Sequence, residues 1–260
     1  MDSMTATSPW HLDERNRAVQ VDGYEWRYVD TGSSGPAIVL LPGSVGTHEV
    51  FFKQIRALGD MHRIVAATYP ACETPEQVAT AFVSFVRHLK LEGALVVGSS
   101  YAAYWLQIVA TAHPQLARGY IFGNGFTNGA MVRNHPLFSE TLIAQDADII
   151  QRTWHEAVTR HAESELRSMQ LDMLGGRQPA SVLRSRLLAV IGAKDVSVLQ
   201  LPAERIVVMD CADDPIITTE ARDAFAKQFP GATRITLDRG GHYPHVLNPE
   251  AYNEVLQRSA

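Results

Sequence analysis

Residues 94–112 read ALVVGSSYAAYWLQIVATA, and this stretch is the most informative about the fold. Residues 94–98 form a short apolar run of the kind found in strands that are buried on both faces of a sheet. The next residues, Ser99 and Ser100, lead directly into a long segment with the composition of a helix. The stretch therefore predicts a strand, a sharp turn and a helix, which is the repeating unit of a parallel α/β sheet.

The same alternation continues on both sides of this stretch. Apolar runs predict further strands at 37–41, 63–67, 119–123, 205–209 and 234–237. Helical patterns lie between them, including one that starts at Thr74 with Pro75 and Gln77 in the positions of a capping box. A last helix is expected to be capped by Asn248. We predict an α/β fold with a mostly parallel central sheet flanked by helices on both faces.

An antiparallel hairpin is expected before the first parallel strand. Residues 18–32, AVQVDGYEWRYVDTG, alternate apolar and polar side chains around Asp22 and Gly23. That dipeptide is typical of a type I′ turn between two strands.

Three regions follow from the pattern. Residues 20–126 and 200–260 carry the alternating strands and helices, and we expect them to form one α/β core. Residues 127–199 are rich in Met, Leu and Arg and carry no convincing strand, so they predict a helical cap inserted over the sheet. Residues 1–19 are mostly polar and are expected to be a poorly ordered N-terminal arm.

Composition narrows the class of protein. A formal net charge of -5 predicts neither a nucleic-acid partner nor binding to an anionic membrane. The sequence contains no run of about 18 apolar residues, so no membrane span is predicted. The polar N-terminus does not resemble a signal peptide, and a cytoplasmic protein is therefore expected. The spacing of the cysteines and histidines predicts no metal, and no organic cofactor is called for. The pattern does not indicate an oligomeric state.

The turn after residues 94–98 has the form of a nucleophile elbow. In such a turn the residues two before and two after the nucleophile must be small, because larger side chains would collide with the strand and helix. Gly98 and Ala102 occupy those positions, which places Ser100 rather than Ser99 at the exposed apex. A lone GxSxA motif is more often structural than catalytic, so the prediction needs partners elsewhere in the chain.

Two such partners follow later strands. His242 lies in the segment GGHYP between the last predicted strand and the final helix, and it is the candidate general base. The segment DCADDP follows the strand at 205–209 and supplies a candidate acid that would orient the imidazole. We favour Asp214, because Pro215 fixes the turn beside it, over Asp213 and then Asp210.

A glycine-containing loop, LPGSVG at 41–46, follows the strand at 37–41 and is called the oxyanion loop below. Its Ser44 amide, together with the amide of Tyr101, would form an oxyanion hole for a carbonyl substrate. All four predicted elements stand at the carboxyl ends of strands, where open α/β sheets place their sites. In and next to the cap, Phe126, Met131 and Trp154 are the predicted substrate-binding residues, with Phe138 and Met169 as further candidates.

These motifs resemble those of the α/β-hydrolase superfamily. The chain is more narrowly similar to maspardin and its relatives in LLPGSVGTHEVFFKQIRAL at 40–58, in RIVAATYPA at 63–71 and from residue 221 to the terminus. The resemblance implies a nucleophile at Ser100, an acid at Asp214 and a base at His242. Pro42 replaces the histidine usual before the oxyanion glycine, and Thr68-Tyr69-Pro70 replaces a usual acidic residue. Maspardin itself looks degenerate at the acid and histidine positions, which this chain keeps.

Together these observations predict a serine hydrolase that cleaves a small-molecule carboxylic ester or thioester through an acyl-enzyme on a Ser-His-Asp triad. Two alternatives remain open. One is a non-hydrolytic enzyme of the same fold, a lyase or cyclase that uses His242 as a base. The other is a non-catalytic binding protein, as the similarity to maspardin permits.

Overall fold

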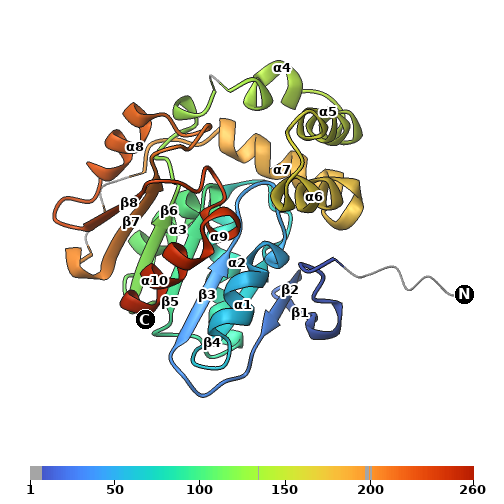
Figure 1. Cartoon of the computed structure of the whole chain (residues 1–260). Helices are drawn as coiled ribbons and strands as arrows, with labels where there is room; N and C mark the ends of the chain where they lie inside the picture. The colour runs from blue at the N-terminus through green and yellow to red at the C-terminus, as the bar shows by residue number, and fades with distance from the viewer. Residues whose placement is uncertain (1–7, 134, 197–198, 200) are drawn as a thin grey trace, which may run out of the picture.

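A computed structural model describes residues 8–133, 135–196, 199 and 201–260 (Figure 1). One sheet of eight strands runs through these residues in the order β1-β2-β4-β3-β5-β6-β7-β8. The strands are β1 (Arg17–Val21), β2 (Tyr24–Asp30), β3 (Ala37–Leu41), β4 (Arg63–Thr68), β5 (Leu95–Ser99), β6 (Gly119–Gly123), β7 (Ile206–Cys211) and β8 (Thr233–Leu237).

The sheet is antiparallel at one edge and parallel elsewhere. Strands β1 and β2 form the expected hairpin, in which Asp22 and Gly23 both have positive φ, at 49° and 83°, as a type I′ turn requires. Strand β2 pairs antiparallel with β4, and every pairing from β4 to β8 is parallel. The predicted α/β fold with a mostly parallel sheet is confirmed.

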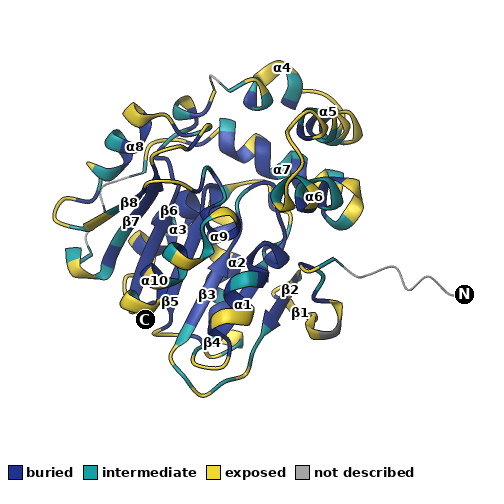
Figure 2. Ribbon diagram, viewed as in Figure 1, coloured by how far each residue is buried: buried dark blue, intermediate teal, exposed yellow. Residues whose placement is uncertain are grey.

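Helices cover both faces of the sheet because its central strands are apolar on both sides. In β3, Ile38 and Leu40 belong to the core on one face, whereas Val39 and Leu41 belong to the core on the other. Helices α1 (Phe52–Leu58) and α10 (Pro249–Ser259) cover the first face. Helices α2 (Pro75–His88), α3 (Tyr101–Ala112) and α8 (Thr219–Ala226) cover the second. Figure 2 shows the strands buried between helices whose outer sides are exposed.

Two predicted helix caps have different outcomes. The capping box of α2 is present, with Thr74 accepting from the Gln77 amide and the Gln77 side chain accepting from the Thr74 amide. Asn248 precedes α10, but its side chain does not cap that helix. Its Nδ2 instead donates to the Arg239 carbonyl at 2.9 Å, and the residue itself separates the short helix α9 (Pro244–Leu247) from α10.

Residues 127–199, the cap segment, carry helices joined by turns and loops, and no strand, where the structure describes them. Their helices are η3 (Gly129–Met131), η4 (Pro136–Phe138), α4 (Glu140–Ile143), α5 (Ala147–Thr159), α6 (Glu165–Asp172), η5 (Met173–Arg177) and α7 (Ala180–Ile191). In Figure 1 the helices α4 to α7 lie above the sheet. The exact division between core and cap stays a prediction.

The N-terminal segment differs from the arm that we expected over residues 1–19. From Ser8 onward the described residues pack on the core, with a turn of helix η1 (Asp13–Arg15) before β1. Trp10 and Leu12 are buried, and the Trp10 indole donates to Asp172 of α6 at 2.8 Å. These two apolar side chains and the hydrogen bond to Asp172 anchor the segment to the rest of the fold. Residues 1–7 lie outside the described residues.

The remaining short helices are η2 (His48–Phe51), after the oxyanion loop, and η6 (Ala203–Arg205), before β7. Among the described residues, no helix has both the length and the apolar character needed to cross a membrane.

Candidate active site

Ser100 stands at the turn between β5 and α3 in a strained backbone conformation. Its φ is 55° and its ψ is -115°, values that a residue with a Cβ rarely adopts. The Ser100 amide donates to the Gly123 carbonyl at 2.8 Å, which ties the turn to the neighbouring strand β6. Strain of this kind is held in place by surrounding structure and is common at functional sites.

The small residues on either side of Ser100 are needed for this turn. A Cβ built on Gly98 would lie 2.6 Å from the Leu106 side chain and 2.8 Å from the Ala102 backbone. Ala102 is itself fully buried, so a larger side chain would have no room there. The physical reason for expecting Ser100 at the apex is therefore visible in the packing.

His242 lies between Ser100 and Asp214. Its Nε2 is 2.9 Å from Ser100 Oγ, and its Nδ1 is 2.8 Å from Asp214 Oδ2. With Nδ1 protonated, the imidazole donates to the carboxylate and leaves Nε2 free to accept the serine proton. The structure thus brings together the three residues that the sequence proposes for catalysis.

The Asp214 carboxylate is buried and fully hydrogen-bonded. Oδ1 accepts from the amides of Ile216 at 2.8 Å and Ile217 at 3.1 Å, and Oδ2 accepts from the Asn124 side chain at 2.6 Å. Burial by itself would raise the pKa of Asp214, but the charge of His242 and these hydrogen bonds hold it at about 2. At neutral pH Asp214 is therefore ionised, and both of its carboxylate oxygens accept hydrogen bonds from fixed donors.

The other two aspartates of the DCADDP segment have different partners. Asp213 accepts from the amides of Gly240 at 3.2 Å and Gly241 at 2.8 Å, and so holds the loop that carries His242. Asp210 is paired with Arg234 at 3.1 Å. Neither is hydrogen-bonded to His242, which agrees with the preference for Asp214.

The oxyanion loop passes directly over the serine. A Cβ on Gly43 would lie 3.0 Å from Ser100 Cβ, a tighter contact than most side chains make, so glycine favours this close approach. No acceptor for the Ser44 amide or the Tyr101 amide is found among the described residues. Tyr101 opens α3, where the first amides lack partners within the helix. Both amides are available to a ligand, and their assignment as an oxyanion hole stays a prediction.

A small cavity of about 20 Å³ adjoins Ser100 and His242. Its walls come from the oxyanion loop, from Ile216 and Tyr243, and from Phe138 and Trp154 of the cap. The two cap rings meet edge to face with centroids 5.6 Å apart. The space suits about one water molecule, so the acyl group of a substrate requires these rings to move.

Two predicted substrate-binding residues are not part of this cavity. Phe126 is buried in the core, where its ring stacks on Tyr104 at a centroid distance of 5.3 Å. Met131 is also absent from the walls, and its sulfur accepts from Thr127 at 3.6 Å. Met169 is buried in the core on the α1 side of the sheet. Helical spacing in the cap could not separate residues that face the cavity from those that fill the core.

Several residues that support the site were not identified from the sequence. Asn124 belongs to no motif, but its position directly after β6, at the carboxyl end of a parallel strand, is a usable signal. It has a φ of 46° and donates both to Asp214 and to the Gly241 carbonyl, at 3.2 Å. Tyr69, Gln178 and Arg186 contact the oxyanion loop; Tyr69 follows β4 as Asn124 follows β6, whereas Gln178 and Arg186 carry no local signal in the sequence.

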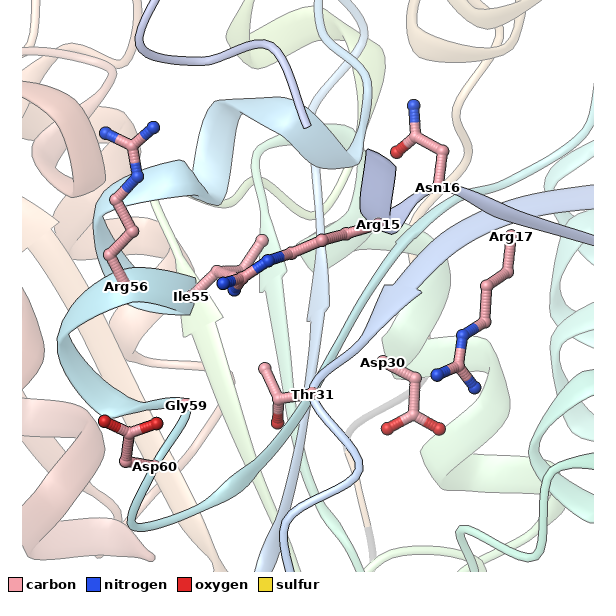
Figure 3. Close-up of a pocket in the computed structure, with 9 residues that line it drawn as sticks. All are labelled: Arg15, Asn16, Arg17, Asp30, Thr31, Ile55, Arg56, Gly59 and Asp60. Carbon is pink, nitrogen blue, oxygen red and sulfur yellow. The ribbon is translucent and has the colours of Figure 1, made fainter. Parts of the chain in front are cut away.

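A larger hollow, of about 500 Å³, lies away from the triad (Figure 3). It is lined by Arg15, Arg17 and Arg56 together with Asp30 and Asp60. Asp30 is already paired with Arg63 at 2.8 Å, and in Figure 3 Arg56 points away from Asp60. The one hydroxyl in its lining, that of Thr31, donates to the His62 carbonyl, and the lining includes none of the residues predicted for catalysis. Among the described residues, no group of three or more histidine, cysteine or acidic side chains is arranged to hold a metal.

Comparison with known proteins agrees with the fold. Human maspardin is 24% identical over 244 residues, which cover 91% of this chain and 79% of maspardin. RutD from Caulobacter sp. (strain K31), named for a proposed carbamate hydrolase activity, is 23% identical over 261 residues, covering 91% of this chain and 95% of RutD.

The solved structure of a thermophilic esterase from Thermogutta terrifontis superimposes with a TM-score of 0.75 at 17% identity, covering 94% of this chain and 97% of the esterase. At that identity the likeness shows the fold alone. The model of the alpha/beta hydrolase family matches residues 38–255. The match spans β3 to α10 and includes all three triad candidates, so the chain belongs to the alpha/beta hydrolase family.

Proposed function

We propose that this protein is a serine hydrolase that cleaves a carboxylic ester or thioester of a small molecule through an acyl-enzyme on Ser100. The observation that carries the proposal is the continuous path from Ser100 Oγ to His242 Nε2, 2.9 Å, and from His242 Nδ1 to Asp214 Oδ2, 2.8 Å. The strained turn under Ser100 supports it, as does the Ser44 amide, which has no acceptor among the described residues.

The first half of the reaction forms the acyl-enzyme. His242 Nε2 takes the proton of the Ser100 hydroxyl while Oγ forms a bond to the substrate carbonyl carbon. The carbonyl oxygen becomes an oxyanion that accepts from the amides of Ser44 and Tyr101. When the oxyanion collapses, the bond to the leaving oxygen or sulfur breaks, and the imidazolium donates its proton to that leaving group.

The second half releases the acid. A water molecule gives a proton to His242 Nε2 and attacks the acyl carbon, and the same amides stabilise the second oxyanion. The bond to Ser100 Oγ then breaks, and His242 returns the proton to that oxygen. Asp214 stays ionised throughout, because its role is to orient the imidazole and stabilise the imidazolium.

Reaction with a fluorophosphonate probe tests the proposal. We expect one phosphonate on the peptide that carries Ser100, with labelling lost in Ser100→Ala and His242→Ala and retained in Ser168→Ala, which changes an exposed serine of the cap. Absence of labelling in the unmodified protein would favour a binding protein. Labelling at Ser100 without hydrolysis of any p-nitrophenyl ester would favour a lyase or cyclase.

A further inference from the structure

The oxyanion loop is held from its inner side by a tyrosine of the core. Tyr69 follows β4 and is 1% exposed, with its ring packed edge-on against Tyr101 and Trp105. Its hydroxyl donates to the Gly43 carbonyl at 3.0 Å. Burial raises the pKa of Tyr69 to about 12, so the hydroxyl keeps its proton and remains a donor at neutral pH.

The Gly43 carbonyl and the Ser44 amide belong to the same peptide group. Because the peptide group is planar and conjugated, a donor on its oxygen fixes the orientation of its N–H and increases the positive charge on that hydrogen. The Tyr69 hydroxyl therefore acts on the amide that the proposed mechanism directs at the oxyanion, although it lies on the opposite side of the peptide.

Arg186 of cap helix α7 holds Tyr69 in place. Its guanidinium lies 3.8 Å from the centre of the Tyr69 ring, and Nη2 donates to the Tyr69 carbonyl at 2.9 Å. Nη1 donates to the Gly46 carbonyl at 2.9 Å and lies 3.4 Å from that of Gly43. One side chain of the cap thus contacts both Tyr69 and the oxyanion loop.

Burying the charge of Arg186 costs free energy, which argues that the residue has a specific role here. It is 2% exposed, and no carboxylate pairs with it among the ion pairs of the described residues. Burial lowers the pKa of Arg186. Its charge is compensated by backbone carbonyls and by an aromatic face, and these belong to Tyr69 and to the loop.

Gln178 completes the attachment of the loop. Its Oε1 accepts from the Gly46 amide at 2.8 Å, and its Nε2 donates to the Ser44 carbonyl at 2.7 Å. The polar backbone groups on both sides of the Ser44 amide therefore have fixed partners, whereas that amide has none among the described residues. The arrangement leaves this N–H for a ligand.

We propose that Tyr69 is a positioning residue for the oxyanion hole, which acts through the Gly43–Ser44 peptide group and is itself held by Arg186 of the cap. The inference rests on the proposed function, because it assigns a role in the stabilisation of the oxyanion. It also implies that the cap and the oxyanion hole are mechanically coupled, since a displacement of α7 would move Arg186 and Tyr69 together.

One test observes the Ser44 amide without any reaction. The sequence contains three Gly–Ser pairs, at 32–33, 43–44 and 98–99. Labelling glycine with carbonyl ¹³C and serine with ¹⁵N therefore selects three amide signals in a carbonyl-filtered spectrum. In Tyr69→Phe, we expect the proton signal of Ser44 to move upfield, because its peptide oxygen loses a donor, while the signal of Ser33 stays in place. An unmoved Ser44 signal would overturn the inference.

A second test uses the rate of reaction. On p-nitrophenyl acetate we expect Tyr69→Phe to lower kcat about tenfold with KM changed less than twofold, because the lost bond acts on the transition state. Arg186→Lys should lower kcat by a similar factor, since lysine cannot make the stacked, forked contact. The matched control is Tyr120→Phe, which removes a buried hydroxyl that has no partner among the described residues and should react like the unmodified protein.

The two claims fail in different ways. If the unmodified protein neither hydrolyses esters nor reacts with a fluorophosphonate, the proposed function is wrong, and the assignment of Tyr69 to catalysis is wrong with it. If the unmodified protein reacts at Ser100 and Tyr69→Phe reacts equally fast, the inference about Tyr69 is wrong and the proposed function stands.

Discussion

At the scale of single residues, the candidate site is defined by how each polar group is held. Ser100 is forced into an unfavourable backbone conformation by the turn, and His242 and Asp214 come within hydrogen-bond distance from separate strand ends. Asn124 and Asp213 stabilise the acid and the histidine loop in turn. These supporting contacts decide the protonation states on which an acyl transfer would depend.

Asn124→Gly tests the support of Asp214. Glycine keeps the positive φ of this position but removes the donor to the carboxylate. We expect the pKa of Asp214 to rise from about 2 toward its ordinary value of 3.8, and kcat on an ester to fall about tenfold for the loss of one bond to a charged group.

Asn124→Gly should also change how the free energy of unfolding depends on pH. Because folding lowers the pKa of Asp214, its contribution to the free energy of unfolding is present above pH 4 and is lost as the pH falls toward 2. The contribution is about 2 kcal/mol in the unmodified protein and should be smaller in Asn124→Gly. Urea unfolding at pH 7, 4 and 3 measures it, and equal acid dependence of the two proteins would contradict the role given to Asn124.

At the scale of elements, the apolar runs were sufficient to predict most strands, because a strand buried on both faces has to be apolar throughout. The elbow and the strand-end loops could also be predicted from the sequence, since glycine, serine and aspartate occur there in a definite order. Tyr69 and Arg186 were not, because their roles depend on contacts between segments far apart in the chain. The cap was the least predictable element, as Phe126 and Met131 show.

Trp154→Ala tests the part of the cap that limits the cavity. Trp154 and Phe138 leave only about 20 Å³ beside Ser100, so we expect the unmodified protein to prefer acetyl among p-nitrophenyl esters of increasing acyl length. Removal of the indole should shift the preference toward longer acyl groups by at least tenfold in relative kcat/KM.

The matched control for this variant is Trp10→Ala. Trp10 is buried to a similar extent, 6% exposed against 5% for Trp154, but it packs near Phe52 and Asp172. This control should lower stability without changing the order of preference. The same shift in both variants would show that loosening of the fold, and not the wall formed by Trp154, determines acyl length.

At the scale of the whole molecule, buried histidines make the fold sensitive to acid. Burial lowers the pKa of His245 to about 3 and that of His48 to about 4. His245 lies among the rings of Phe51, Tyr243 and Tyr252, and neither of its ring nitrogens has a partner among the described residues. The unfolded chain binds these protons near pH 6.5, so stability falls as the pH drops from about 6.5 toward 3 to 4.

His245→Phe should remove part of this sensitivity. For a histidine with a pKa of about 3 in the folded protein, the loss between pH 7 and pH 4 is about 3 kcal/mol of unfolding free energy. Phenylalanine does not titrate and suits the apolar surroundings. Between pH 7 and pH 4, the unfolding free energy of the variant should therefore fall by about 3 kcal/mol less than that of the unmodified protein. The exposed His88→Gln is the control and should follow the unmodified protein. Parallel curves for all three proteins would show that His245 is not the sensitive group.

The central claim is that the oxygen of Ser100 becomes acylated during turnover. The most direct measurement mixes the protein with p-nitrophenyl acetate, quenches it in acid within the first turnover and locates the added mass by peptide mass spectrometry. We predict one acetyl group on the peptide that carries Ser100, formed as fast as p-nitrophenol is first released and absent in Ser100→Ala. An acetyl group found only on another residue, or turnover that persists in Ser100→Ala, would contradict the claim.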